Sequence, residues 1–424
     1  MKIITNNFEL KFDKKVMLIV LFFFYIFSPP LLPININIVI EGIAVIYILF
    51  SLIKNRKKFA IRLAEIKLIA FFIPFFLYIT VMLLVHINIQ PHYYEGFMDT
   101  YNIVCRVFIR GIIIISAYAI YSKRNNISID DWFAVIYWVG LIQIFFVVLT
   151  LLIPQLRENI LNMIQQNSTA DVVVDVIERL SSRRGYGLAS NLFDAFGYLL
   201  AFMVCVTILL WFEDNAKKRI VVCMLLLVAN LLNSRTGVLL SLIAIITCFI
   251  IYKKSYRHIK IIFLAMVFAA PIFLIGINTI EFLSPDTLAW VSEGIEELSK
   301  FIFEGERTGI FAAFSDFTFF PDDIIFGAGA PPDYLINRWS DIGYIICIWD
   351  YGIVGTVLLL GGYIASLLYA YKNALQSKEK TFAITAIAIF LIYLYKLYSI
   401  GNFGANFIMF SFAITVMSNS KKAT

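Results

Sequence analysis

Seven ionisable side chains lie within or at the ends of the long hydrophobic runs of this 424-residue chain. They are Glu41, Arg106, Arg110, Asp194, Arg235, Asp350 and Lys396. A charge inside a bilayer costs roughly 2.5–3.5 kcal/mol on insertion scales, so it is retained where it has a partner, water or a ligand. The direction of the runs places all seven toward one side of the membrane, which indicates a common site.

The spacing of Arg106 and Arg110 favours an anionic ligand. They are four residues apart, so they share one helical face, and we predict them one and two turns below the outer surface. Two such guanidiniums repel each other unless an anion lies between them, and phosphate or pyrophosphate matches their planar donors. The alternative is that each reaches a lipid phosphate or pairs with Asp194 or Asp350.

The turn Asn233-Ser234-Arg235-Thr236-Gly237 joins two short hydrophobic runs. About thirteen residues separate Arg219 from Asn233, roughly 20 Å of helix against a core of about 30 Å. We therefore predict that the turn lies below the outer surface, with Arg235 in a cavity. The alternative is an ordinary hairpin whose arginine reaches the headgroups. Asp194, Asp350 and Lys396 are expected to form neutralising ion pairs.

The composition assigns the chain to polytopic membrane proteins. Hydrophobic residues make up 61% of it and charged residues 15%, whereas soluble domains average about 45–50% and 25%. All five cysteines lie within apolar runs and the three histidines have no ligand spacing, so we expect no disulfide framework, metal or cofactor. The net charge of +6 arises mainly from connecting segments, so we expect no nucleic-acid partner.

The hydrophobic runs predict an all-α fold with about twelve transmembrane helices in one domain, residues 1–424. The runs lie at 16–34, 36–53, 68–86, 101–121, 133–153, 190–212, 219–233, 237–252, 260–280, 341–362, 381–399 and 402–419. Placing both termini in the cytoplasm gives the inner segments three times as many Lys and Arg residues as the outer loops, as the positive-inside rule requires.

Two outer loops are long, 154–189 and 281–340. In the second, apolar residues recur at helical spacing among acidic ones over 287–304, including Trp290, Phe301 and Glu297. Either this amphipathic helix lies on the outer face and caps a cavity, or it faces solvent without contacting the site.

Four motifs in order resemble the O-antigen polymerase (Wzy-type) family, within the O-antigen polymerase and ligase superfamily. They are Arg184-x-x-Gly187-x-x-Ser190-Asn191, Ser234-Arg235-Thr236-Gly237, a large outer loop with Arg307 and Gly327-x-Gly329, and Ser340-Asp341-Ile342-Gly343-Tyr344 followed by Gly352-Ile353-Val354-Gly355. The resemblance covers roughly residues 180–360. Ligases of the superfamily have a histidine where this chain has Asp341, and this departure resembles the polymerase branch.

The resemblance implies a GT-C-like fold and a glycosyl transfer between undecaprenyl-pyrophosphate-linked glycans at the periplasmic face of a bacterial inner membrane. It further implies membrane lipid and a chain-length regulator protein as partners. Arg106, Arg110, Arg184, Arg235, Arg307 and Lys396 are the candidates for binding the pyrophosphate or glycan. The same resemblance makes Arg235, Arg307 and Asp341 the candidate catalytic residues. Asp341 would be the general base, or alternatively a helix N-cap. Asp194 and Asp350 would support them.

Three alternatives to a polymerase remain at the level of sequence. A flippase or exporter of lipid-linked glycan would also need buried cations, but alternating access favours charges at mid-depth and two balanced halves. A ligase is disfavoured by the missing histidine. A non-catalytic envelope scaffold would not need the buried arginines.

Overall fold

The computed structural model describes residues 14–31, 35–54, 68–89, 94–166, 185–190, 193–252, 319–332, 342–396 and 401–423, parts of 289–305, and residues 336 and 340. All regular structure within these ranges is helical. The helices are α1 Lys14–Phe27, α2 Ile36–Lys54, α4 Ile73–Ile89, α5 Tyr94–Asn125, α6 Ile129–Leu152, α7 Pro154–Gln166, α9 Phe193–Asp214, α10 Lys217–Asn233, α11 Arg235–Tyr252, η2 Lys300–Glu304, α15 Gly343–Asn373, α16 Ser377–Lys396 and α17 Phe403–Ala423.

Seven helices of the described ranges are long and apolar enough to cross a membrane, which confirms the multi-pass character. Eleven of the twelve predicted runs overlap a helix, and the run 260–280 lies outside the described residues. Helices α1, α4 and α10 are short, with 14, 17 and 17 residues. They fall below the roughly 20 residues that a straight crossing requires, although the residues from Leu68 extend the α4 span to 22 residues.

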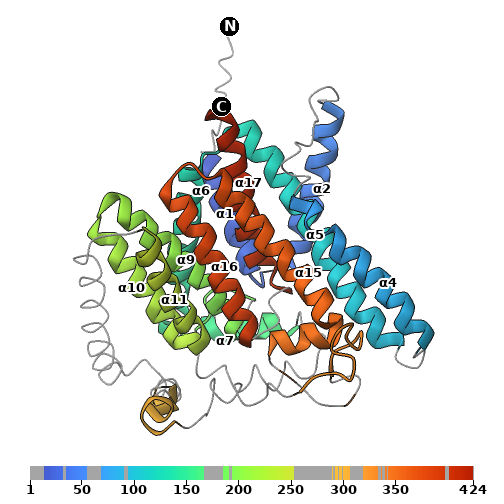
Figure 1. The fold of residues 1–424 in the computed structure, drawn as a ribbon. Coiled ribbons are helices and arrows are strands. Elements are labelled where there is room, and N and C mark those ends of the chain that lie inside the picture. The colour runs from blue at the N-terminus through green and yellow to red at the C-terminus, as the bar shows by residue number, and fades with distance from the viewer. Residues whose placement is uncertain are drawn as a thin grey trace.

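Helix α9 forms the centre of the bundle. Its candidate span is 89% buried, against 22% for the span Leu68–Ile89 at the periphery. The sequence of α9 is apolar on all faces, which is typical of a helix surrounded by others. It packs against α6, α10, α11 and α16. In Figure 1, α10 and α11 lie on one side of the bundle and α2 and α4 on the other.

Ion pairs link several helix ends at one end of the bundle. Lys15 of α1 contacts Asp131 of α6 at 2.6 Å, and Lys378 of α16 contacts Glu213 of α9 at 2.7 Å. Lys378 also pairs with Asp130, the neighbour of Asp131. The start of α1 and the end of α17 both lie here, at the top of Figure 1, while α7 and the segment 292–304 lie at the opposite end.

The arginine pair lies well inside helix α5. The helix begins at Tyr94, seven residues before the predicted apolar run 101–121. Arg106 and Arg110 therefore lie about three and four turns from the start of the helix, and their depth below the membrane surface stays a prediction. The polar segment 94–101 extends the helix because Glu95 and Asp99 lie in its first turns, where the helix dipole favours acidic side chains.

Candidate functional site

The turn that carries Arg235 is a hydrogen-bonded junction of three helices. Ser234 Oγ donates to Asp194 Oδ1 of α9 at 2.9 Å and accepts from the Gly237 nitrogen at 2.9 Å. The Gly237 carbonyl accepts from Asn230 of α10 at 3.2 Å. A Cβ on Gly197 of α9 would lie 2.6 Å from the Gly237 Cα, so α9 and α11 touch through two glycines. Asp194 thus positions the turn through Ser234.

Asn233 ties this turn to the first outer motif. Its Nδ2 donates to the carbonyl of Gly185 at 2.9 Å and to that of Ala229 at 2.8 Å. Gly185 directly follows Arg184 in the sequence, although Arg184 itself lies outside the described residues. The first two motifs of the resemblance therefore meet in space.

The segment 185–190 is fixed by neighbouring helices. Gln143 of α6 donates to the carbonyl of Tyr186 at 2.6 Å, and the Ser190 nitrogen donates to the carbonyl of Phe27 at 3.0 Å. Gly187 has a φ of +61° and lies against α6, where a Cβ would come within 2.8 Å of Gln143 Nε2. Both the positive φ and the close approach require glycine.

Arg235 is paired with two carboxylates of the described part of 289–305. Its Nη1 lies 2.6 Å from Glu297 Oε1 and its Nη2 lies 3.3 Å from Glu293 Oε2. The side chain of Arg235 is only 16% exposed. A Cβ on Gly294 would lie 2.8 Å from Arg235 Nε, so the glycine lets the segment approach the guanidinium closely. Of the two interpretations of 287–304, the described part of the segment agrees with a cap over the site.

The neighbouring glutamate behaves differently. Glu296 is exposed and pairs with Lys300 one turn along at 2.7 Å. This lysine lowers the pKa of the Glu296 carboxyl. Glu296 therefore lies on the solvent side of the segment, while Glu293 and Glu297 face Arg235.

Arg110 forms a second cationic site, at α5. Its Nε lies 2.7 Å from Glu41 Oε2 of α2, and its guanidinium carbon lies 4.0 Å from the ring centre of Phe403. Glu41 also accepts from the hydroxyl of Tyr25 at 3.1 Å. The buried Nη2 of Arg110 makes no hydrogen bond within the described part of the chain. Glu41 is thus the buried counter-ion of Arg110.

Arg106 does not form a buried pair with Arg110. Its side chain is exposed, on the same side of α5 as Ile103 and Ile109, which are 43% and 58% exposed. The two arginines lie on one face of α5, as their spacing predicts. That face borders the contact between α5 and α2. One guanidinium faces outward and the other inward.

The third region joins two glycine motifs. A Cβ on Gly327 would lie 2.3 Å from the Gly352 nitrogen, and Gly352 interrupts α15 with a φ of +65°. The Ile353 nitrogen donates to the Ile324 carbonyl at 2.9 Å, and the Ala328 nitrogen donates to the Trp349 carbonyl at 2.7 Å. The outer loop thus replaces helical hydrogen bonds of α15, as broken membrane helices require.

A small, mainly apolar pocket lies beside this break. Its polar lining residues include His86, Asp350, Tyr101 and Thr100. The buried Nε2 of His86 has no hydrogen-bond partner among the described residues, and Gly329 packs against the imidazole. Asp350 is half-buried here, on a different side of the bundle from the Arg235 turn.

Of the remaining candidate site residues, some lie within the described part of the chain and some outside it. Arg184, Arg307 and Asp341 lie outside the described residues. Lys396 is half-buried at the end of α16. Within the described ranges, the seven charges therefore belong to at least three separate environments, not to one cluster.

Residues that the sequence does not mark as site candidates complete these environments. Glu293 and Glu297 were expected only as the polar face of a helix, although their spacing of four residues could have indicated a shared contact. Arg157 of α7 lines a shallow pocket with Tyr186 and Gly187. Burial lowers the pKa of the Arg157 guanidinium, which still remains a cation at neutral pH.

Within the described residues, no group of three His, Cys, Asp or Glu side chains converges to hold a metal ion. No model of a known protein family matches the chain, and no curated protein matches it.

Proposed function

We propose that this chain is a polysaccharide polymerase of the Wzy type, which joins lipid-linked oligosaccharide repeats at the periplasmic face of a bacterial inner membrane. The observation that best supports this is the meeting of sequence motifs that lie far apart in the chain. Asn233 binds the Gly185 carbonyl, and Gly327 interlocks with Gly352. The four motifs of the resemblance thus meet in two pairs, and both pairs are at the end of the bundle that carries the outer segments.

The presence of two cationic sites also supports an enzyme with two lipid-linked substrates. Arg235 lies on α11, which packs mainly against α9, α10 and α16, whereas Arg110 lies on α5, which packs mainly against α2, α4 and α17. The two sites have different counter-ions, Glu297 and Glu41. A polymerase binds a donor and an acceptor, each carrying a phosphorylated lipid. A flippase moves one such lipid at a time.

The proposed reaction is a glycosyl transfer without a metal. An acceptor hydroxyl attacks the anomeric carbon of the donor, the bond from that carbon to the pyrophosphate oxygen breaks, and lipid pyrophosphate leaves. Preorganised cations stabilise the negative charge that develops on the leaving group. Arg235 is the candidate for this role among the described residues. We propose Arg184 and Arg307 as further cations for the same role. Asp341 is the proposed acceptor of the hydroxyl proton.

Binding of the leaving group requires an exchange of partners at Arg235. Glu293 and Glu297 now accept from its guanidinium, and a pyrophosphate offers the same kind of oxygen acceptor. A substrate phosphate would therefore displace one or both carboxylates. Arg106, Arg110 and Lys396 remain proposed contacts for the lipid-linked glycans, with Asp350 as a supporting residue.

Deletion of the gene tests this proposal. We expect single repeats on the lipid A core and no ladder of longer glycans on a gel, because transfer of one repeat does not need polymerisation. Complete loss of even single repeats would instead indicate a flippase or a ligase. An unchanged ladder would exclude all three activities.

A further inference from the structure

Helix α4 is fastened to the break in α15 by the side chain of Tyr78. Its hydroxyl lies 2.8 Å from the carbonyl oxygen of Tyr351 and 3.1 Å from that of Phe326. Tyr351 directly precedes Gly352, where α15 is interrupted, and Phe326 belongs to the loop that pairs with the broken helix. One side chain of α4 therefore holds both the helix and the loop at the break.

His86 lies about two turns further along α4 and meets the same loop. Gly329 packs against its imidazole, where a Cβ would come within 2.7 Å of His86 Cδ2, and the φ of Gly329 is +81°. The ring centre of Phe97, in the first turns of α5, lies 5.3 Å from that of His86. Contacts with the loop and with α5 thus fix the orientation of the imidazole.

The fixed imidazole lines the pocket that joins α4, α5 and α15. Asp350, Thr100 and Tyr101 are further polar residues of its lining. The buried Nε2 of His86 has no hydrogen-bond partner within the described part of the chain. Because buried polar atoms in folded proteins are nearly always hydrogen-bonded, this nitrogen indicates that the pocket has a polar occupant.

The polar groups of the pocket match hydroxyl groups better than they match a phosphate. Its described lining contains no lysine or arginine, and its acidic member is Asp350. A carboxylate accepts hydrogen bonds from hydroxyl or ammonium groups and repels a phosphate, whereas an imidazole can donate or accept. Binding pockets of this kind are mostly apolar with a few polar groups that orient the ligand. The composition favours a neutral sugar or an amino sugar.

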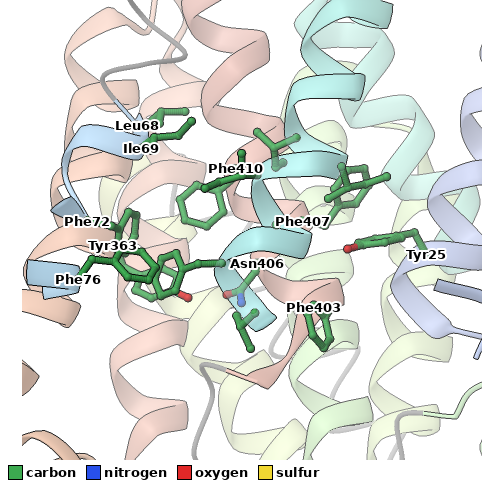
Figure 2. A pocket seen from close by; sticks show the side chains of 16 residues that line it. Tyr25, Leu68, Ile69, Phe72, Phe76, Tyr363, Phe403, Asn406, Phe407 and Phe410 are labelled. Atoms are coloured by element: carbon green, nitrogen blue, oxygen red, sulfur yellow. The ribbon is translucent and has the colours of Figure 1, made fainter. Parts of the chain in front are cut away.

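A second pocket beside α5 lacks this chemistry. It lies between α1, α4, α5, α15 and α17, and aromatic rings such as Phe72, Phe76 and Phe410 form much of its wall (Figure 2). Its polar groups are the amide of Asn406 and tyrosine hydroxyls, and neither a carboxylate nor an imidazole lines it. Of these two pockets, the one beside the α15 break has the groups that recognise a sugar.

We propose that the pocket beside the α15 break is a subsite for one sugar ring of the glycan, whose hydroxyl groups bind His86 and Asp350. The inference rests on the proposed function for the glycan as ligand. The pocket lies on a different side of the bundle from the Arg235 turn, so the bound sugar is remote from the bond that reacts. Binding energy from a remote part of a substrate helps to position the reacting part. The subsite therefore contributes to the choice of repeat unit.

The test uses a glycan probe without lipid or phosphate. Mild acid releases the repeat oligosaccharide from the lipid-linked pool of the host strain, whether or not this chain polymerises it. The chain has three histidines, so replacing His92 and His258 by glutamine leaves the ¹⁵N imidazole signal of His86 alone. In full-length protein in nanodiscs, we expect the oligosaccharide to shift this signal saturably. Asp350→Asn should raise the Kd about tenfold, as expected for the loss of a hydrogen bond to a charged group.

Two controls separate the subsite from other effects. Asn88→Gln alters an exposed amide of α4 that bonds to its own helix, and should leave the Kd unchanged. Inorganic pyrophosphate should not shift the His86 signal, because the described lining has no cation. Thr100→Val, which removes a lining hydroxyl at similar volume, serves as the second variant and should also raise the Kd.

Three results would overturn the subsite: a His86 signal that the oligosaccharide does not move, an equal shift with pyrophosphate, or a wild-type Kd in both folded variants. Loss of laddering on gene deletion together with an unmoved signal would keep the polymerase and remove the subsite. A saturable shift with an unchanged ladder would keep the subsite and contradict the polymerase.

Discussion

The guanidinium of Arg235 lies 2.6 Å from the carboxylate of Glu297, although 62 residues separate them in the chain. The arginine begins α11 at the junction with α9 and α10, and the glutamate belongs to the second long outer loop. The contact places the acidic face of that loop directly over the cation proposed to bind pyrophosphate. If Arg235 binds a phosphate as proposed, the phosphate would compete with Glu297 and Glu293 for the guanidinium.

Neutralising Glu297 should strengthen substrate binding. In Glu297→Gln the charge that competes with a phosphate at Arg235 is lost, while the side-chain volume is kept. We expect the KM for the lipid-linked repeat to fall about tenfold, equivalent to 1.4 kcal/mol. Steady-state polymerisation in reconstituted vesicles measures this. Glu296→Gln is the control, since Glu296 pairs with Lys300 away from Arg235 and its KM should not change.

Removal of the Ser234 hydroxyl should destabilise the turn. In Ser234→Ala, Asp194 loses its donor and the Gly237 nitrogen loses its acceptor. An unsatisfied buried group costs about 1–3 kcal/mol, so we expect a lower midpoint of thermal unfolding in detergent. Ser366→Ala removes only a hydroxyl bonded to a carbonyl of its own helix and should have a smaller effect. Equal midpoints for both variants would mean that Asp194 does not position the turn.

A side chain at Gly352 should disrupt the break in α15. Its φ of +65° is unfavourable for alanine, and the added Cβ would lie 2.3 Å from the Ile325 carbonyl oxygen. We expect Gly352→Ala to lower the yield of folded protein in size-exclusion chromatography. Gly361→Ala, on the same helix with open space at its Cβ, should be neutral or stabilising. Similar yields from the two variants would contradict the interlocked loop.

The orientation of the bundle can be tested with single added cysteines. Phe303 is 82% exposed beside the Arg235 cap, and Lys123 is exposed at the opposite end. A maleimide that cannot cross the membrane should label Phe303→Cys in intact spheroplasts. It should label Lys123→Cys only after permeabilisation. The native protein gives the background, since four of its five cysteines are buried. The reverse pattern would place the site in the cytoplasm.

Much of the fold follows from the hydrophobic pattern, and the site follows only in part. The helices are predictable because each apolar run must form its own backbone hydrogen bonds in lipid. The short run before the Asn233–Gly237 turn predicts that the turn lies below the membrane surface, and this depth stays a prediction. What the structure shows is that Asn233, Ser234 and Thr236 are buried among the helices. Helix α5 starts seven residues before the predicted run because its first turns are polar, and polar residues give no hydropathy signal.

The partners of the charges could not be read from the sequence. Glu41 and Arg110 are 69 residues apart, and Arg235 and Glu297 are 62 apart, so no local spacing pairs them. Periodicity gave Arg106 and Arg110 a common face but not the direction of that face, which depends on the packing of α2 against α5. The described members of the seven charges do not form one cluster. A common depth in the membrane does not determine where a side chain lies around the bundle.

The most direct test of the central claim is glycan laddering in a deletion strain complemented with Arg235→Ala, compared with Arg235→Lys and with the wild type at matched protein levels. Because only the guanidinium fork can bind a pyrophosphate through paired donors, we expect single repeats from Arg235→Ala and a ladder reduced at least tenfold from Arg235→Lys. A full ladder from Arg235→Ala would contradict the role of this arginine in polymerisation.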